Sequence, residues 1–162
     1  MQSKILVMPS LSTARKRSKH SAPSAEGSTS GTHSESSDRI LIVEDDLLIA
    51  SQIEVALTDA GFQIVGTAST GKEALELAKL QSPTLVVMDI RLPGDRDGID
   101  TALDLFRSHG IRCIFASAYS DQEAQRRAGP AEPLGWLQKP YTMASLTAKV
   151  HAAVSELRSG PD

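Results

Sequence analysis

The chain has 162 residues and a formal net charge of −3, and 40% of its residues are hydrophobic but only 4% aromatic. This length suits one domain with a core of Leu, Ile, Val and Ala, and the charge does not favour attraction of the whole chain to nucleic acid or to an acidic membrane. The single cysteine, Cys113, excludes an intrachain disulfide, and no apolar run approaches the roughly 18–20 residues of a membrane span.

Residues 1–38 differ in composition from the remainder. They are rich in Ser, Gly, Thr, Pro and Ala and hold five basic and three acidic residues, whereas the remainder holds twelve and seventeen. We predict a disordered N-terminal tail over residues 1–38, because it has no hydrophobic period to bury. Its basic cluster at residues 15–19 is expected to be solvated, with contact to an acidic partner as the alternative. The short apolar patch near the start does not resemble a signal peptide, so a cytoplasmic location is expected.

From Arg39 onward, strand-like runs alternate with helical periodicity. Apolar runs predict strands at residues 40–43, 62–68, 84–88, 111–116 and 134–138. Apolar residues at helical spacing predict helices at residues 46–60, 70–80, 99–106, 121–128 and 142–157. We therefore expect one folded domain over residues 39–158, followed by a short C-terminal tail over residues 159–162.

This alternation predicts an α/β fold with a doubly wound parallel sheet and helices on both faces. Each return to a parallel strand needs a crossover helix, and the fixed handedness of crossovers leaves few topologies. Gly61 and Gly110 follow two of the predicted helices, where a left-handed residue is favoured. Cys113 falls within a predicted strand and is expected to be a small buried side chain. Ligands of such folds bind beyond the carboxyl ends of the strands.

Polar side chains follow four of the predicted strands at this edge. Glu44 and Asp45 follow the first strand, Asp89 the third, Ser117 the fourth and Lys139 the fifth. Two unit charges about 5 Å apart repel by roughly 3 kcal/mol at an effective dielectric near 20, so three carboxylates in one cleft need a cation. Oxygen ligands favour a hard metal, and the sequence therefore predicts a site for Mg²⁺ or Mn²⁺.

The same set of groups is typical of phosphoryl transfer. A carboxylate nucleophile, a divalent metal, a lysine and a hydroxyl suffice for this chemistry. The metal and Lys139 would neutralise charge on the phosphoryl oxygens, and Ser117 would donate to one of them. Simpler roles stay open: Asp89 could cap a loop, and the acid pair could belong to a helix N-terminus that Asp46 caps.

Four stretches resemble the response regulator receiver family of two-component signalling. They are RILIVEDD at residues 39–46, LVVMDIRLPGDRDG at 85–98, IFASAY at 114–119 and GWLQKPY at 135–141. They follow the family's order and extend the resemblance to about residue 157. The resemblance implies a flavodoxin-like receiver fold with a five-stranded parallel sheet in the order 2-1-3-4-5.

The resemblance also implies roles at the metal site. Asp89 matches the aspartate that accepts the phosphoryl group. Glu44 and Asp45 match the acidic pair that positions Mg²⁺, directly or through water. Arg91 matches the position whose backbone carbonyl completes the metal site.

Further matches concern the phosphoryl group and the switch. Ser117 matches the switch Ser/Thr, and Lys139 matches the lysine that stabilises the phosphoryl group. Pro140 matches a proline that often follows a cis bond. Trp136 matches the aromatic residue that swings inward on activation, although the residues alone favour a packing role equally.

The sequence departs from the common family pattern in three places. The loop over residues 89–98 holds one extra residue, and the fourth helix is short and followed by Gly129 and Pro130, in a region that forms the family's signalling face. Trp136 is bulkier than the usual Tyr or Phe. Tyr119, two residues after the switch serine, lies where family members tune the lifetime of the phosphorylated form.

The function we expect is that of a stand-alone receiver. It would be phosphorylated on Asp89 by a sensor histidine kinase or a histidine phosphotransfer protein and would signal to a downstream protein by contact. We expect no binding to nucleic acid or membrane and at most weak autodephosphorylation. A homodimer is compatible with this function. One alternative is a phosphohydrolase of the haloacid dehalogenase type, but that class expects an Asp at the position of Arg91. Another is a receiver-like scaffold that is never phosphorylated.

Overall fold

The structure is a computed structural model that describes residues 38–160. The predicted N-terminal tail, apart from Asp38, and the last two residues of the predicted C-terminal tail lie outside this part of the chain. So does the basic cluster at residues 15–19.

Strands and helices alternate along the described residues and build one parallel sheet. The strands are β1 Arg39–Val43, β2 Gln63–Ala68, β3 Leu85–Met88, β4 Cys113–Ser117 and β5 Gly135–Gln138. The helices are α1 Leu47–Asp59, α2 Gly71–Gln81, α3 Gly98–His109, α4 Gln122–Ala128 and α5 Met143–Ser159, with a short 3₁₀ helix, η1 Gly129–Ala131, after α4. The strand order is β2-β1-β3-β4-β5, which confirms the predicted fold class and topology.

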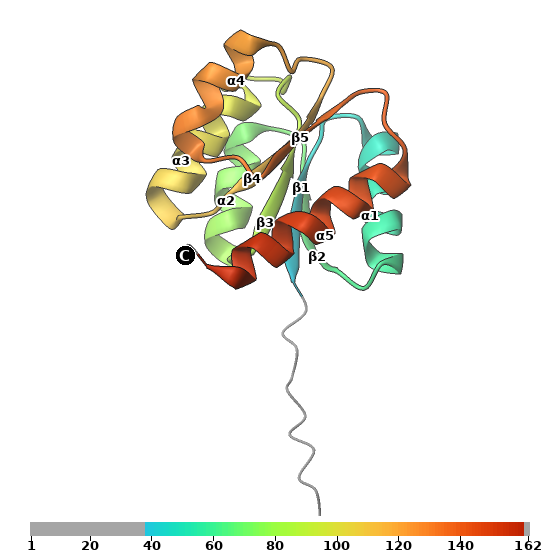
Figure 1. Ribbon diagram of the computed structural model, residues 1–162. Coiled ribbons are helices and arrows are strands. Elements are labelled where there is room, and N and C mark those ends of the chain that lie inside the picture. Colours follow the sequence, from blue (N-terminus) through green and yellow to red (C-terminus); the bar gives the residue numbers. More distant parts are fainter. Residues whose placement is uncertain (1–37, 161–162) are drawn as a thin grey trace, which may run out of the picture. The chain divides into compact units, whose positions relative to one another are not determined.

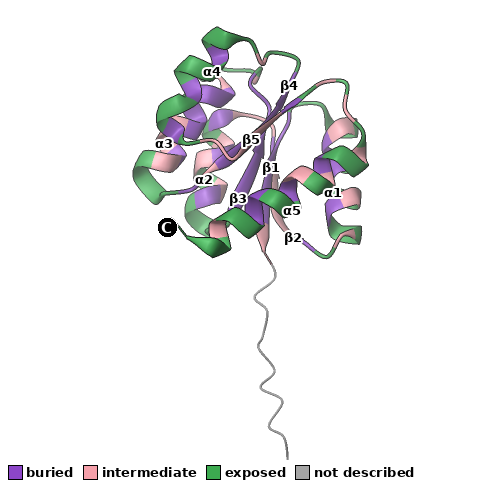
Figure 2. Ribbon diagram, in the orientation of Figure 1, coloured by how far each residue is buried: buried purple, intermediate pink, exposed green. Residues whose placement is uncertain are grey.

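Two hydrophobic cores lie on opposite faces of this sheet, as Figures 1 and 2 show. Helices α1 and α5 cover one face, and α2, α3 and α4 cover the other. Successive strand residues point to opposite faces, so Ile40 and Ile42 of β1 join the first core while Leu41 and Val43 join the second. Because both faces are covered, the interior strand β1 is apolar throughout its buried part.

The helix ends follow the local chemistry of the sequence. Asp46 caps α1, and its carboxylate accepts hydrogen bonds from the backbone N–H groups of Leu48 (2.9 Å) and Ile49 (3.1 Å), which confirms its predicted role. Gly61 and Gly110 have φ angles of +93° and +65°, the left-handed conformation that glycine adopts without a steric cost.

The fourth strand begins two residues later than the apolar run suggests. The backbone N–H of Ile111 donates to the carbonyl of Leu105 at the end of α3 (3.4 Å), so it is not free to extend the strand. Cys113, which opens β4, is 1% exposed, as predicted, and burial raises the pKa of its thiol to about 12. Among the described residues, no helix is both long and apolar enough to cross a membrane.

The start of α3 lies directly against the strand end that carries Asp89. The backbone N–H of Gly98 donates to the carbonyl of Ile90 at 2.7 Å. A Cβ atom at Gly98 would lie 1.9 Å from the carbonyl oxygen of Asp89, far inside van der Waals contact. Only glycine fits here, and α3 therefore fixes the backbone of the strand end beneath the site.

We expect Gly98→Ala to lower the free energy of unfolding by at least about 1–3 kcal/mol, because the methyl group forces the strand end and the helix apart. Urea unfolding followed by circular dichroism measures this difference. Gly129→Ala is the matched control, since no atom lies within 4 Å of its added Cβ and its φ of −46° is helical. Equal stability of the two variants would contradict the close approach.

Candidate functional site

The sheet itself brings the polar residues together. The backbone N–H of Glu44 donates to Ala68 (2.9 Å), that of Asp89 to Val43 (2.9 Å) and that of Lys139 to Ser117 (3.1 Å). Each bond continues the strand ladder one residue beyond the apolar run. The backbone at this edge is thus as well fixed as the strands that precede it.

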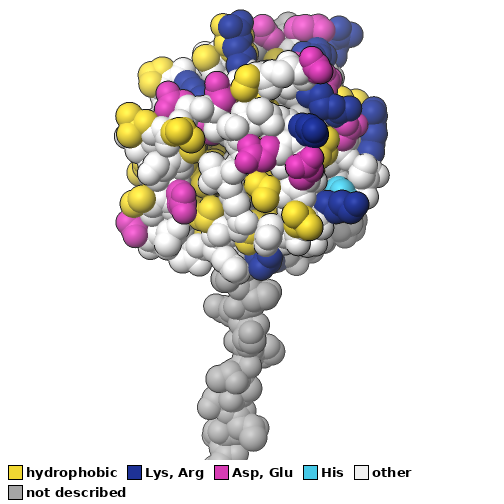
Figure 3. Space-filling view, turned by 180° about the vertical axis from the view of Figure 1, so that it is seen from behind, with side chains coloured by type: hydrophobic (Ala, Val, Ile, Leu, Met, Phe, Trp, Pro, Cys, Tyr) yellow, Lys and Arg dark blue, Asp and Glu magenta, His cyan; other side chains and the backbone are white. Residues whose placement is uncertain are grey.

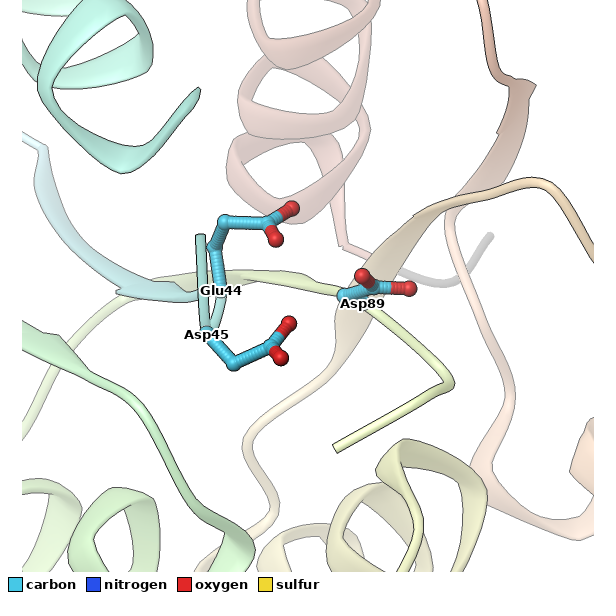
Figure 4. A group of neighbouring side chains, drawn as sticks. All are labelled: Glu44, Asp45 and Asp89. Atoms are coloured by element: carbon cyan, nitrogen blue, oxygen red, sulfur yellow. The ribbon is translucent and has the colours of Figure 1, made fainter. Parts of the chain in front are cut away.

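Three carboxylates meet at this edge, as Figure 4 shows. Glu44, Asp45 and Asp89 each offer one oxygen, and these oxygens all lie within 4.8 Å of one another. Glu44 is 3% exposed and Asp89 7% exposed, whereas Asp45 is exposed to solvent. Two of the three negative charges are therefore largely removed from water.

Lys139 supplies the positive charge that faces these acids. Its Nζ donates to Oε2 of Glu44 at 2.7 Å and to Oδ2 of Asp89 at 3.0 Å. Burial lowers the pKa of Lys139, but the hydrogen bonds to Glu44 and Asp89 outweigh it and the net change is upward. The ammonium thus stays charged and bridges the strand ends of Glu44 and Asp89, which lie 95 and 50 residues before Lys139 in sequence.

Glu44 is the most deeply buried of the acids. Burial raises its pKa, and the hydrogen bonds from Lys139 and from the backbone N–H of Asp46 (3.1 Å) only partly oppose this effect. The negative charge of Asp89 raises the pKa of Glu44 further. The ionised form of Glu44 is therefore energetically unfavourable unless a second cation lies nearby.

The other residues of the site surround Asp89. The backbone N–H of Arg91 donates to Oδ1 of Asp89 at 3.3 Å, and the buried hydroxyl of Ser117 accepts from the backbone N–H of Tyr119 at 3.4 Å. Together with the three acids and Lys139, these residues line an open cleft of about 320 Å³. The cleft is large enough for a small anion next to Asp89.

A stacked pair at this cleft was not foreseen from the sequence. The guanidinium carbon of Arg91 lies 3.7 Å above the ring centre of Tyr119, within the range of a cation–π contact. Arg91 follows Asp89 by two residues, and Tyr119 follows Ser117 by two. This equal offset from neighbouring strand ends is the signal that could have predicted the pair.

Trp136 does not line this cleft. Its indole stacks on Phe115 of the adjacent strand β4, with ring centres 4.6 Å apart and an interplanar angle of 26°. This contact is the packing role that the sequence left open beside a switch role. The Lys139–Pro140 peptide bond is cis in the structure.

The donor set fits a small divalent cation. All three acidic side chains offer oxygen, the ligand that Mg²⁺ and Mn²⁺ prefer. Opposite ligands of Mg²⁺ lie about 4.2 Å apart, close to the 4.8 Å within which the three oxygens already lie. Asp45 and the cleft are open to water, so a cation would keep part of its hydration.

The comparison with known families decides what this arrangement belongs to. The profile of the response regulator receiver domain matches residues 40–151. The chain belongs to the response regulator receiver family. The match includes all five strands apart from Arg39, and it includes the residues of the acidic cluster, Glu44, Asp45 and Asp89.

Individual relatives agree with this assignment. The receiver is 38% identical over 120 residues to the transcriptional regulatory protein PdtaR of Mycobacterium tuberculosis, covering 74% of this chain and 58% of PdtaR. It is 31% identical over 104 residues to the chemotaxis protein CheY of Thermotoga maritima, covering 64% of this chain and 86% of CheY. The chain thus spans a little over half the length of PdtaR and most of CheY.

Solved structures show the same fold. The signal receiver domain of a modulated diguanylate cyclase from Desulfovibrio desulfuricans G20 superposes with a TM-score of 0.71 at 30% sequence identity. The superposition covers 77% of this chain and 99% of that domain. The fold is therefore that of a receiver domain.

The raised pKa of Glu44 predicts how stability depends on pH. The unfolded chain releases this proton at a lower pH than the folded one, so the group's contribution to stability is present in acid and is lost as the pH rises through its folded pKa. We expect Glu44→Gln, in metal-free buffer, to gain thermal stability relative to the wild type between pH 4 and pH 7. Melting temperatures at both pH values test this.

Glu54→Gln is the matched control, because Glu54 is exposed on α1. Its melting temperature should follow that of the wild type at both pH values. A difference between Glu44→Gln and the wild type that does not grow with pH would contradict the electrostatic account.

Proposed function

We propose that the receiver accepts a phosphoryl group on Asp89 from the phosphohistidine of a sensor kinase or a histidine phosphotransfer protein. The observation that carries this proposal is the position of Asp89, whose carboxylate faces an open cleft and has a lysine ammonium on one oxygen and a backbone N–H on the other. Signal would then pass to a downstream protein by contact.

In the proposed reaction, a carboxylate oxygen of Asp89 forms a bond to phosphorus as the bond from phosphorus to the histidine nitrogen breaks. The leaving imidazole keeps that electron pair and is neutralised by a proton. The ammonium of Lys139, already 3.0 Å from Asp89, stays beside the negative charge that builds on the phosphoryl oxygens. The hydroxyl of Ser117 would donate to one of these oxygens after transfer.

Glu44, Asp45 and Asp89, with the backbone carbonyl of Arg91, would hold Mg²⁺, and Mn²⁺ suits the same ligands. A bound divalent cation supplies charge neutralisation for the acids and for the phosphoryl group. Glu44 and Lys139 then act chiefly by setting the charge of the site. Arg91 lies where a phosphohydrolase of the haloacid dehalogenase type would need an acid, so the site is proposed as an acceptor and not as a turnover enzyme.

Intact-mass spectrometry after incubation with acetyl phosphate and Mg²⁺ tests the proposal. The wild type should gain the mass of one phosphoryl group, and it should gain none when EDTA is present from the start of the incubation. Asp89→Asn should gain none, because the amide cannot form an acyl phosphate.

Asp59→Asn is the control for a surface acid, since Asp59 is exposed at the end of α1, and it should be labelled like the wild type. Full labelling of Asp89→Asn would assign the reaction to another residue. Absence of label in the wild type, with acetyl phosphate and with a phosphorylated kinase, would favour the scaffold that is never phosphorylated.

A further inference from the structure

A second cleft lies next to the proposed phosphoacceptor site, and the proposed function makes no use of it. Its volume is about 410 Å³, and it separates the loop that follows Asp89 from helix α4. Its lining includes the apolar side chains of Ile90, Leu92 and Ala124. Arg91 and Tyr119 line both this cleft and the first one, so the two are neighbours.

An ion pair joins the two walls of this second cleft. The guanidinium of Arg127, on α4, donates to Oδ2 of Asp97 at 2.8 Å and to Oδ1 of Asp100 at 3.3 Å. Asp97 and Asp100 belong to the start of α3, 30 and 27 residues away in sequence. Figure 3 shows that Lys and Arg side chains gather toward the side of the molecule formed by α2, α3 and α4.

Arg126 offers an internal comparison with Arg127. Its guanidinium pairs with Glu123, three residues earlier on the same helix. The two arginines have the same charge and adjacent positions on α4. Arg127 ties α4 to α3, whereas the pair of Arg126 lies within α4.

The contact made by Arg127 continues to Asp89 through two short steps. Oδ1 of Asp97 accepts from the backbone N–H of Asp100 at 2.8 Å and so caps α3. The next residue, Gly98, has no room for a Cβ because the carbonyl oxygen of Asp89 would lie 1.9 Å away. A displacement of Asp97 would therefore also displace Gly98 and the backbone carbonyl of Asp89 that lies against it.

The hydroxyl of Ser117 connects the site to the segment that leads into α4. It accepts a hydrogen bond from the backbone N–H of Tyr119 at 3.4 Å. Its proposed donation to a phosphoryl group on Asp89 would draw residues 117–121 toward β3. This segment leads directly into α4, whose N-terminus Asp121 caps through the N–H of Ala124 at 2.8 Å. A shift of α4 relative to α3 stretches the pair between Arg127 and Asp97.

We infer that Arg127 is a positioning residue that holds the phosphoryl-free arrangement of the site, acting on Asp89 through Asp97 and Gly98. This inference rests on the proposed function. A contact made in the resting arrangement and weakened in the phosphoryl-bound one opposes phosphoryl binding by the free energy that is lost. The pair is largely exposed, so its effect is modest and its loss leaves the fold intact.

The test is the affinity for beryllofluoride, a phosphoryl mimic, in the presence of Mg²⁺, measured by calorimetry and by Trp136 fluorescence. Arg127→Gln should bind about two- to fivefold more tightly than the wild type, the range expected for an exposed ion pair. Arg126→Gln should bind beryllofluoride like the wild type. The affinity of Arg127→Lys should lie closer to that of the wild type than the affinity of Arg127→Gln does, because Lys keeps the positive charge. Melting temperatures of all variants should agree closely.

Asp97→Ser removes the carboxylate partner but keeps a side-chain oxygen that caps α3. It should strengthen binding as Arg127→Gln does, and the double variant should add less than the sum of the two. Binding by Arg127→Gln that equals that of Arg126→Gln, or is weaker than that of the wild type, would overturn the inference.

Amide hydrogen exchange separates this inference from the proposed function. Without any phosphoryl mimic, Arg127→Gln should exchange faster than Arg126→Gln in α4 and in residues 90–98. If the wild type fails to bind beryllofluoride, the proposed function fails, and unchanged exchange in both segments overturns the coupling independently.

Discussion

The bridge that Lys139 makes between Glu44 and Asp89 is the interaction on which the rest of the site depends. Without it, two largely buried carboxylates would face each other across a cleft with no counter-charge, an arrangement that proteins avoid. With it, one ammonium joins the ends of three strands and keeps the acid cluster together. The site is still short of positive charge, because Asp45 adds a third acid and burial raises the pKa of Glu44. That shortage is what suits the cluster to a divalent cation and to a reaction in which charge is moved.

The fold supplies the precision that this chemistry needs. The backbone of each central acid continues a strand ladder, and Gly98 lets α3 pack against the carbonyl of Asp89 without an intervening side chain. The residues in front of the site are less constrained. The cleft is open and Tyr119 is 41% exposed. The contacts that cross toward α4 are the stack of Arg91 on Tyr119 and the largely exposed ion pairs of Arg127 with Asp97 and Asp100. A well-fixed backbone beneath the site and exposed side chains in front of it are the combination expected of a switch. In a switch, a small change at one residue shifts the populations of two conformations.

Much of this arrangement follows from local sequence. The run Ile40–Val43, buried on both sides, allows only an interior strand, and the parallel topology then forces the polar residues after each strand to one edge. The acidic cluster and its lysine were predictable for that reason. The Arg127–Asp97 pair was not, because it depends on a distance between two helices that no periodicity encodes. The stack of Arg91 on Tyr119 had only one signal in the sequence, the equal offset of the two residues from neighbouring strand ends. The contact of Trp136 could not be predicted from the sequence either, since only the pairing of β4 with β5 reveals its stack on Phe115.

The most direct test of the role of Lys139 is the Mg²⁺ affinity of Lys139→Met, measured by calorimetry. It is compared with the affinity of the wild type and of Lys72→Met, a control at an exposed lysine. If the ammonium of Lys139 is the resident counter-charge of the acid cluster, its removal frees the carboxylates, and Mg²⁺ should bind more tightly and raise the melting temperature more than in the wild type. Lys72→Met should match the wild type. Mg²⁺ affinity in Lys139→Met that is unchanged or weaker, in a variant that still unfolds cooperatively, would contradict the claim that this one interaction governs the charge of the site.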